Sequence, residues 1–271
     1  MDTYRIKLPA GRRVPVVVSV PHCGTAFPEE IKDDYRAELI KAPDDTDWFV
    51  DRLYGFAPSI GITMISAVLS RWVIDLNRSP ADIPLYSDGR IITGLCPTTT
   101  FLGDPLYKDG RSKVEAEEIK RRTELYYRPY HAGLREILDD LKSEFGQVLL
   151  WDCHSIRQRV PTLYAGKFPD LILGSADGRS AEEDLIEIAL DNLVDEGYTL
   201  HHNEPFKGGY VTRNYGRPEK GEHALQLEMS KINYMDDFEL QYEPVRAERI
   251  GKVLHKTLGS LGDALLSAKD Y

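Results

Sequence analysis

The sequence predicts an α/β fold: a single domain, spanning residues 1–271, with a mixed, largely parallel central sheet flanked by helices. Two observations carry this prediction. Apolar runs typical of buried strands alternate along the chain with segments whose apolar residues recur at helical spacing. No internal repeat, low-complexity tract or clear linker divides the 271 residues, a length that suits one large domain.

The expected elements follow from apolar periodicity. Apolar runs predict strands at 14–20, 72–76, 148–151, 171–173 and 224–229. Helical spacing predicts helices around 48–56, 134–141, 185–193 and 250–258. The charged stretch 113–128 is expected to be a solvated helix that Pro129 ends or kinks. The loop-rich segments 77–113 and 202–222 are longer than most connections, which is typical of functional loops.

Composition excludes several classes of partner. A net charge of −10 argues against nucleic acid or an anionic membrane surface as the main partner. Three cysteines without a Cys-x-x-Cys spacing do not form a disulfide framework and suit a reducing compartment. The first residues lack the apolar stretch of a signal peptide, and no apolar run reaches the ~18 residues of a membrane span. We therefore expect a soluble cytoplasmic protein, whose oligomeric state the sequence does not indicate.

Two predicted strands each end in a histidine. The run 14–20 leads into His22, and the run 148–151 leads into Asp152, Cys153 and His154. Because side chains alternate along a strand, Asp152 and His154 point to one side and Cys153 to the other. Two histidines at strand ends favour a metal site or a histidine-based catalytic site, and buried structural histidines are the alternative.

A metal site needs a further ligand, and the acidic segment 44–47 is the best candidate region. Its carboxylates precede an amphipathic stretch, so helix capping is the competing interpretation. The thiols of Cys23 and Cys153 each neighbour a histidine, which leaves a metal-free Cys-His hydrolase as a distant alternative. Sequence neighbours on a strand point apart, however, and buried inert thiols are the simpler interpretation.

Three further segments carry candidate chemistry. Arg78 follows the run 72–76 and is suited to bind a carboxylate, although a surface salt bridge is the alternative. Glu228 lies in an otherwise apolar strand, where a glutamate is costly unless it is paired or functional. Beside a metal such a residue serves as general base, and the alternative is a glutamate at the sheet rim paired with a cation. The glycines in 207–213 permit close approach to a ligand, or form a plain surface turn.

Taken together, these motifs resemble the N-formylglutamate amidohydrolases, also called N-formylglutamate deformylases, of the histidine-degradation pathway. The resemblance covers most of the chain, and so many motifs in one order are more specific than any one of them. The motifs are Val20-Pro21-His22-Cys23-Gly24, Asp45-Thr46-Asp47-Trp48 with Arg52-Leu53-Tyr54, Val73-Ile74-Asp75-Leu76-Asn77-Arg78, Thr93-Gly94-Leu95-Cys96-Pro97 with Pro105-Leu106-Tyr107, Leu150-Trp151-Asp152-Cys153-His154-Ser155-Ile156-Arg157, Phe206-Lys207-Gly208-Gly209 through Thr212-Arg213, and Gln226-Leu227-Glu228.

The resemblance implies a phosphorylase/hydrolase-like, zinc carboxypeptidase-like domain with one catalytic zinc, and it implies roles for residues of this chain. Cys23 departs from the small residue expected after the first histidine. The implied roles are metal ligation by His22, Asp47 and His154, with Asp45 as the alternative carboxylate beside them; catalysis by Glu228; orientation of His154 by Asp152; and substrate binding by Asn77, Arg78, Arg213, Thr212 and Gly209, with Arg157 a weaker candidate.

The implied activity is zinc-dependent hydrolysis of the formamide of N-formyl-L-glutamate, a small anionic substrate, to formate and L-glutamate. Two other functions stay open: an amidohydrolase acting on another N-formyl or N-acyl amino acid, and a non-catalytic protein that binds a small molecule on the same fold. The same ligands also accept manganese, cobalt or iron, so the native metal stays open.

Overall fold

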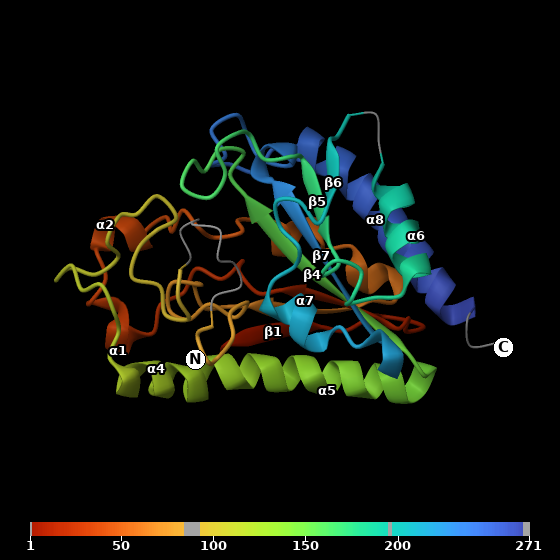
Figure 1. The fold of residues 1–271 in the computed structure, drawn as a ribbon, viewed down its shortest axis with the longest axis horizontal. Coiled ribbons are helices and arrows are strands. Elements are labelled where there is room, and N and C mark those ends of the chain that lie inside the picture. Colours follow the sequence, from red (N-terminus) through yellow and green to blue (C-terminus); the bar gives the residue numbers. More distant parts are fainter. Residues whose placement is uncertain (1, 84–92, 195–196, 268–271) are drawn as a thin grey trace.

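The computed structural model describes residues 2–83, 93–194 and 197–267, and their core is one seven-stranded sheet (Figure 1). The strand order is β1-β3-β2-β4-β7-β5-β6. The four strands β3, β2, β4 and β7 run parallel, while β1 and β5 are antiparallel to their neighbours β3 and β7. This confirms the predicted mixed, largely parallel sheet. The strands are β1 (Tyr4–Lys7), β2 (Val16–Val20), β3 (Thr63–Ala67), β4 (Val148–Ile156), β5 (Leu171–Gly174), β6 (Leu200–His202) and β7 (Glu222–Ser230).

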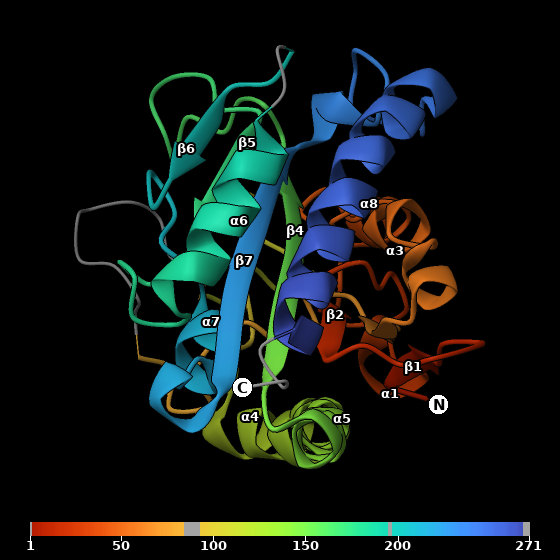
Figure 2. The same ribbon diagram turned by 90° about the vertical axis from the view of Figure 1, so that its right-hand side faces the viewer.

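Helices cover both faces of the sheet. The long helices α6 and α8 lie together on one face (Figure 2), and α5 runs along the other side of the sheet (Figure 1). The described α-helices are α1 (Glu29–Lys32), α2 (Ala37–Ile40), α3 (Val50–Leu53), α4 (Ala116–Arg122), α5 (Arg128–Phe145), α6 (Glu183–Leu193), α7 (Tyr210–Tyr215) and α8 (Pro244–Ser267), with a π-helical turn at Thr123–Tyr127 and 3-10 turns at Ala57–Ile60, Pro218–Lys220 and Lys231–Asn233.

Strand periodicity divides the apolar interior into two cores. Val16 and Val18 of β2 point into the core beneath α6 and α8, whereas Val17 points into the core beneath α5. On β4, Trp151 belongs to the first core and Leu150 to the second. Both faces of the central strands are therefore apolar over most of their length, which explains why they read as continuous apolar runs.

The predicted strand at 72–76 is wrong, because this segment forms turns and pairs with no strand. Its apolar side chains fill the core beneath α5, so burial rather than sheet pairing explains the apolar run. One strand beside β2 is β3, which pairs with β2 on one side and β1 on the other. The strands β1, β3 and β6 lie in segments for which no strand was predicted.

Two helical predictions need correction. The stripe at 48–56 becomes only the short helix α3 and a following 3-10 turn, because Phe49 adopts a left-handed conformation with a φ of 64°. Pro129 does not end the helix: α4, the π-helical turn and α5 continue in one line (Figure 1), with Pro129 in the first turn of α5. The other three predicted helices correspond to α5, α6 and α8.

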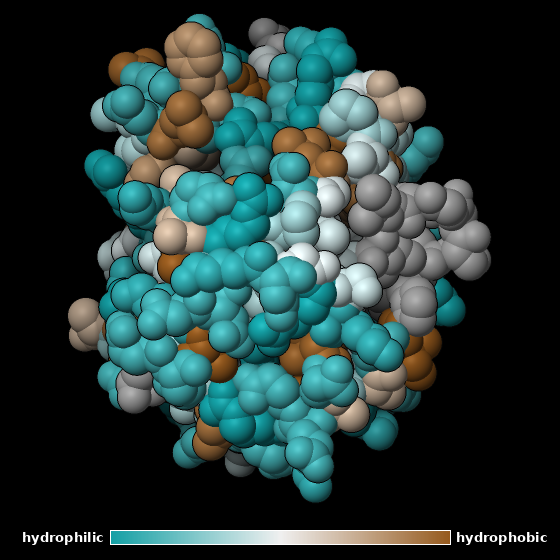
Figure 3. Space-filling view, turned by 90° about the vertical axis from the view of Figure 1, so that its left-hand side faces the viewer, coloured by the Kyte–Doolittle hydropathy of each residue, from teal (hydrophilic) through white to brown (hydrophobic). Residues whose placement is uncertain are grey.

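One of the two predicted loops is confirmed over its described residues, and the other needs correction. Outside residues 84–92, which lie beyond the described part, the segment 77–113 contains no helix or strand. The segment 202–222 is not all loop, since it contains α7 and a 3-10 turn. Figure 3 views the end of the molecule formed by α1, α2 and the neighbouring loops, where the surface is mostly hydrophilic and apolar side chains lie in separate groups. Within the described residues, no helix is long and apolar enough to cross a membrane.

Candidate active site

A polar group lies where the central parallel strands β2, β4 and β7 end. On β4 and β7, which are in register, His154 is paired with Glu228 and Asp152 with Gln226. Asp152 Oδ2 lies 2.9 Å from His154 Nε2, so these side chains share one side as predicted. Cys153 points to the opposite side, into the core beneath α6 and α8. The carboxyl ends of parallel strands thus form the candidate site, as is common in α/β proteins.

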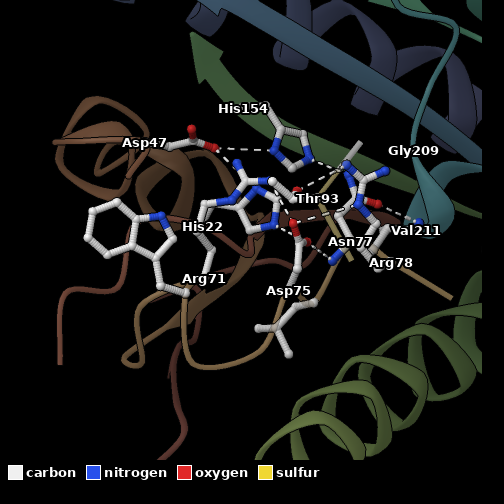
Figure 4. A network of polar contacts seen from close by, with 12 residues as sticks. His22, Asp47, Arg71, Asp75, Asn77, Arg78, Thr93, His154, Gly209 and Val211 are labelled. Atoms are coloured by element: carbon white, nitrogen blue, oxygen red, sulfur yellow. Dashed lines mark hydrogen bonds and ion pairs between the residues drawn. The ribbon is translucent and has the colours of Figure 1, made fainter. Parts of the chain in front are cut away.

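Three buried side chains converge at this edge: His22, Asp47 and His154 (Figure 4). Asp47 Oδ2 lies 3.2 Å from His154 Nδ1 and 3.7 Å from His22 Nδ1. The Asp47 backbone N–H donates to the His22 carbonyl, which fixes the acidic segment beside the end of β2. One ligand atom from each residue lies within 4.8 Å of the others, a spacing that fits a single divalent ion.

The acidic segment presents Asp47, rather than Asp45, to the two histidines. The carboxylate of Asp45 accepts hydrogen bonds from the Trp72 indole and the Phe101 backbone N–H, so it holds neighbouring loops together. Asp47 does not cap α3, whose N-terminal residue is preceded by Phe49. Buried Asp47 Oδ1 forms no hydrogen bond with any described residue, as expected for an atom that binds a ligand.

Each histidine is backed by a carboxylate. His22 Nε2 lies 2.8 Å from Asp75 Oδ1, and His154 Nε2 lies 2.9 Å from Asp152 Oδ2. An Nε2–H that donates to a carboxylate leaves the Nδ1 lone pair free to bind a metal, and such carboxylates orient metal-binding histidines. Both Nδ1 atoms face Asp47, and His22 Nδ1 forms no hydrogen bond within the described residues. Donor type, orientation and unsatisfied atoms therefore all fit a bound metal ion.

The electrostatics of the three residues agree with this interpretation. Burial and the charge of Arg71 lower the pKa of His22, which favours the neutral imidazole that metals require. Burial also opposes charge on His154, but Asp152 and Asp47 outweigh it and raise its pKa well above the usual value. Burial alone would raise the pKa of Asp47, yet His154 and His22 lower it. These shifts show that positive charge is stabilised between His154 and Asp47. The same surroundings would stabilise a metal cation at that position.

Glu228 lies beside His154 on the neighbouring strand and is only partly buried. Within the described residues its carboxylate forms no ion pair with a lysine or arginine, so the rim-pair alternative is not supported. Burial raises the pKa of Glu228 to about 8, Asp47 adds to the rise, and His154 and Arg71 oppose it. A cation at the neighbouring ligands would lower this pKa.

Two residues of the site were missed as site residues in the sequence. Arg71 is buried, donates to Asp75 Oδ2 at 2.6 Å, and lies over the Phe101 ring. Burial would raise the pKa of Asp75, but Arg71 and His22 hold it well below the usual value. The sequence did offer one signal for Arg71, which directly precedes the apolar run 72–76. An arginine that is buried with such a run needs an anionic partner.

Asn77 and Arg78 extend from this network (Figure 4). The Asn77 side-chain amide lies 3.0 Å from His154 Nε2, and its oxygen accepts from the Val211 backbone N–H at 2.7 Å. Asn77 thus lies between a predicted ligand and the start of α7. The Arg78 guanidinium lies 3.9 Å from Asp75 and 3.4 Å from the Thr93 hydroxyl. The structure brings both residues to the site, on the side away from Asp47.

The predicted glycine loop also reaches the site. Gln226 Oε1 accepts from the Gly209 N–H at 2.8 Å, and a Cβ on Gly209 would lie 2.3 Å from the Asn77 side chain, so a larger residue there would displace the Asn77 amide. Thr212 is fully buried on α7, and Arg213 Nε donates to the Gly208 carbonyl. Arg157 forms ion pairs with Asp44 and Glu239 instead.

The cysteines are not arranged as catalytic thiols. Burial raises the pKa of Cys23 and Cys153 well above the usual value, so both thiols stay protonated. Cys153 packs in the apolar core away from His154. This agrees with the prediction of inert thiols.

Comparison with known proteins finds similar sequences over most of the chain. The chain is 42% identical over 252 residues to an N-formylglutamate deformylase of Pseudomonas putida, with 92% of each protein covered. It is 43% identical over 251 residues to an N-formylglutamate deformylase of Pseudomonas aeruginosa, covering 92% of this chain and 93% of that protein.

Solved structures show the same fold. The crystal structure of an N-formylglutamate amidohydrolase from Ralstonia eutropha JMP134 matches with a TM-score of 0.79 and 28% identity, covering 100% of this chain and 98% of that one. A protein from Agrobacterium tumefaciens shares the fold with a TM-score of 0.70 and 17% identity over 96% of both chains. A family model described as N-formylglutamate amidohydrolase matches residues 14–235. The chain therefore belongs to the N-formylglutamate amidohydrolase family.

Proposed function

We propose that this protein is a metal-dependent hydrolase that cleaves the formamide of N-formyl-L-glutamate to formate and L-glutamate. The observation that carries the proposal is the convergence of His22, Asp47 and His154, with Glu228 on the strand beside His154. Relatives that are 42% and 43% identical bear the name N-formylglutamate deformylase, which supports the substrate.

The residues that would hold the metal are His22, Asp47 and His154, through two imidazole Nδ1 atoms and a carboxylate. Two imidazoles and one carboxylate suit zinc, which leaves a position for water. When bound, such an ion supplies an activated water and polarises the formyl oxygen. Asp75 and Asp152 keep the two imidazoles oriented with their Nδ1 atoms towards Asp47.

Glu228 is the proposed general base and acid. Its carboxylate takes a proton from the attacking water and passes it to the departing nitrogen, so that the amine leaves as a neutral group. Its position is fixed by the pairing of β7 with β4 on one side and β5 on the other. The buried charge of Arg71, which acts on both Asp47 and Glu228, would stabilise negative charge that develops on the formyl oxygen.

The substrate carries two carboxylates, and we propose that arginines bind them. Arg78, beside Asn77, is the proposed partner of one carboxylate and Arg213 of the other, with Gly209 and Thr212 shaping the loop between them. Two fixed anchors would place the formamide carbonyl at the metal ligands. We further infer that the whole chain forms one catalytic domain, similar to the zinc carboxypeptidases, and acts at the last step of histidine degradation.

An amidohydrolase acting on another N-formyl or N-acyl amino acid is the second candidate, since side-chain specificity depends on the loops around Arg78 and Arg213. A non-catalytic binding protein is disfavoured because Glu228 lies beside the ligands without an ion-pair partner among the described residues. Hydrolysis of a panel of N-formyl and N-acyl amino acids separates these candidates.

The deciding experiment measures formate release from N-formyl-L-glutamate before chelation, after verified metal removal, and after zinc is restored. Activity that is lost and regained supports the reaction, the substrate and the metal together. Activity that survives verified metal removal overturns the metal mechanism. Inactivity of the zinc-loaded protein on this substrate moves the proposal to another acyl amino acid.

A further inference from the structure

The segment Leu76–Arg78 carries two proposed substrate-binding residues, yet it is not part of the sheet. Its backbone must therefore be held by other groups. Asp75 accepts from the backbone N–H groups of Asn77 and Arg78, and the Asn77 carbonyl accepts from the Tyr210 N–H of α7 at 3.4 Å. The carbonyls of Leu76 and Arg78 are bound by side chains of the π-helical turn and α5.

Helix side chains bind the carbonyl on each side of Asn77. His131 Nε2 lies 3.0 Å from the Leu76 carbonyl, and the Tyr127 hydroxyl donates to the Arg78 carbonyl at 2.8 Å. Since a carbonyl only accepts, His131 must carry its proton on Nε2. Its Nδ1 lies 2.9 Å from the Tyr215 hydroxyl, which can donate to Nδ1 in this tautomer.

The π-helical turn Thr123–Tyr127 explains how both side chains reach the segment. It ends at Tyr127, immediately before α5 begins, and such insertions change which side chains face a given neighbour. Tyr127 and His131 are four residues apart, and their rings stack with centroids 4.1 Å apart. Tyr127 is 4% exposed, so its hydroxyl acts away from water.

We propose that Tyr127 and His131 are positioning residues: by fixing the carbonyls on either side of Asn77, they set the Asn77 amide against His154 and aim the Arg78 guanidinium at the substrate. The inference rests on the proposed function, in which Arg78 binds a substrate carboxylate. Neither helix residue contacts the metal ligands directly among the described hydrogen bonds, so both act through the segment that they hold.

The test compares two single-oxygen deletions in the same π-helical turn, Tyr127→Phe and the matched control Tyr126→Phe. The Tyr126 hydroxyl binds Glu30 and Arg121, away from the segment 76–78. Loss of the Tyr127 hydrogen bond is expected to raise KM for N-formyl-L-glutamate about fivefold with kcat within about twofold of wild type. The control is expected to keep the wild-type KM.

A double-mutant cycle with Arg78→Ala shows whether Tyr127 acts through Arg78. If it does, Tyr127→Phe has little further effect on KM once Arg78 is absent. An unchanged KM in the single variant, or an effect of full size in the Arg78→Ala background, would overturn the proposal.

Hydrogen exchange tests the contact without any substrate. The peptide spanning 76–80 is expected to exchange faster in Tyr127→Phe than in Tyr126→Phe, because the amides of Asn77 and Arg78 both donate to Asp75. Equal exchange in the two variants contradicts the positioning role even if wild-type protein does not hydrolyse N-formyl-L-glutamate. Inactive wild type would count against the proposed function alone.

Discussion

The substitution Asp75→Asn tests whether the carboxylate behind His22 controls metal binding. Asp75 Oδ1 accepts from His22 Nε2 at 2.8 Å and from the Asn77 N–H at 2.9 Å, while Oδ2 accepts from Arg71 at 2.6 Å. All three contacts need an acceptor. Asparagine has the same shape but offers one oxygen and one N–H₂ group, so either Arg71 or His22 must lose its acceptor.

The expected magnitude follows from these contacts. Loss of an oriented carboxylate behind a metal-binding histidine typically weakens metal binding about 10- to 100-fold, equivalent to about 1.4 to 2.8 kcal/mol. In either orientation the asparagine is neutral, so the buried cation Arg71 also loses its nearest charged partner, which is expected to reduce the free energy of unfolding by about 3 kcal/mol.

The assay is competition for zinc against a chromophoric chelator, with urea unfolding of the metal-free protein alongside it. Asp45→Asn is the matched control, since Asp45 is also buried but binds Trp72 and Phe101 instead of a histidine. We expect a 10- to 100-fold weaker zinc affinity only for Asp75→Asn. Equal zinc affinity in wild type and Asp75→Asn would refute the role assigned to this carboxylate.

Three further substitutions test other parts of the argument. Glu228→Gln should retain zinc but lower kcat about 10²- to 10⁴-fold, and a variant with more than about a tenth of wild-type kcat excludes the proposed base. Arg78→Ala should lower kcat/KM for N-formyl-L-glutamate about 10- to 100-fold, mainly through KM, whereas unchanged kinetics remove Arg78 from substrate binding. Burial lowers the pKa of His131 from 6.5 to about 4. The unfolded chain therefore binds more protons than the folded chain in this range, and about 3 kcal/mol of stability present above pH 6.5 is lost as the pH falls towards 4. Urea unfolding from pH 7 to pH 4.5 should show a shallower decline for His131→Gln than for wild type, and identical slopes contradict the assignment.

The sequence predicted the central parallel strands because burial on both faces leaves an unbroken apolar run. The same signal misled at 72–76, where the side chains are equally buried but the backbone makes turns. Apolar content reports burial, and it reports sheet pairing only indirectly. The edge strand β1 is mostly exposed, so it carries no such signal.

The candidate site was predictable where the chemistry lies on strands. Alternation placed Asp152 beside His154, and the structure confirms their 2.9 Å contact. Asp75 and Arg71 were not identified, because their roles depend on a tertiary approach of the turn segment to His22 that no local pattern records. The choice between Asp45 and Asp47 also depends on a tertiary contact, because the Trp72 indole donates a hydrogen bond to Asp45.

The register of β4 against β7 has a consequence for how this protein can change. His154 and Glu228 are paired across two strands whose nine residues match one to one, so their separation is set by sheet geometry and not by any loop. Insertions in the segments before α7 or around 93–113 can reshape what is recognised without altering that separation. Deleting one residue within β7 before Glu228 would instead move the apolar Met229 into the position opposite His154. The residues proposed for the reaction and those proposed for substrate recognition therefore lie in parts of the chain that can vary independently.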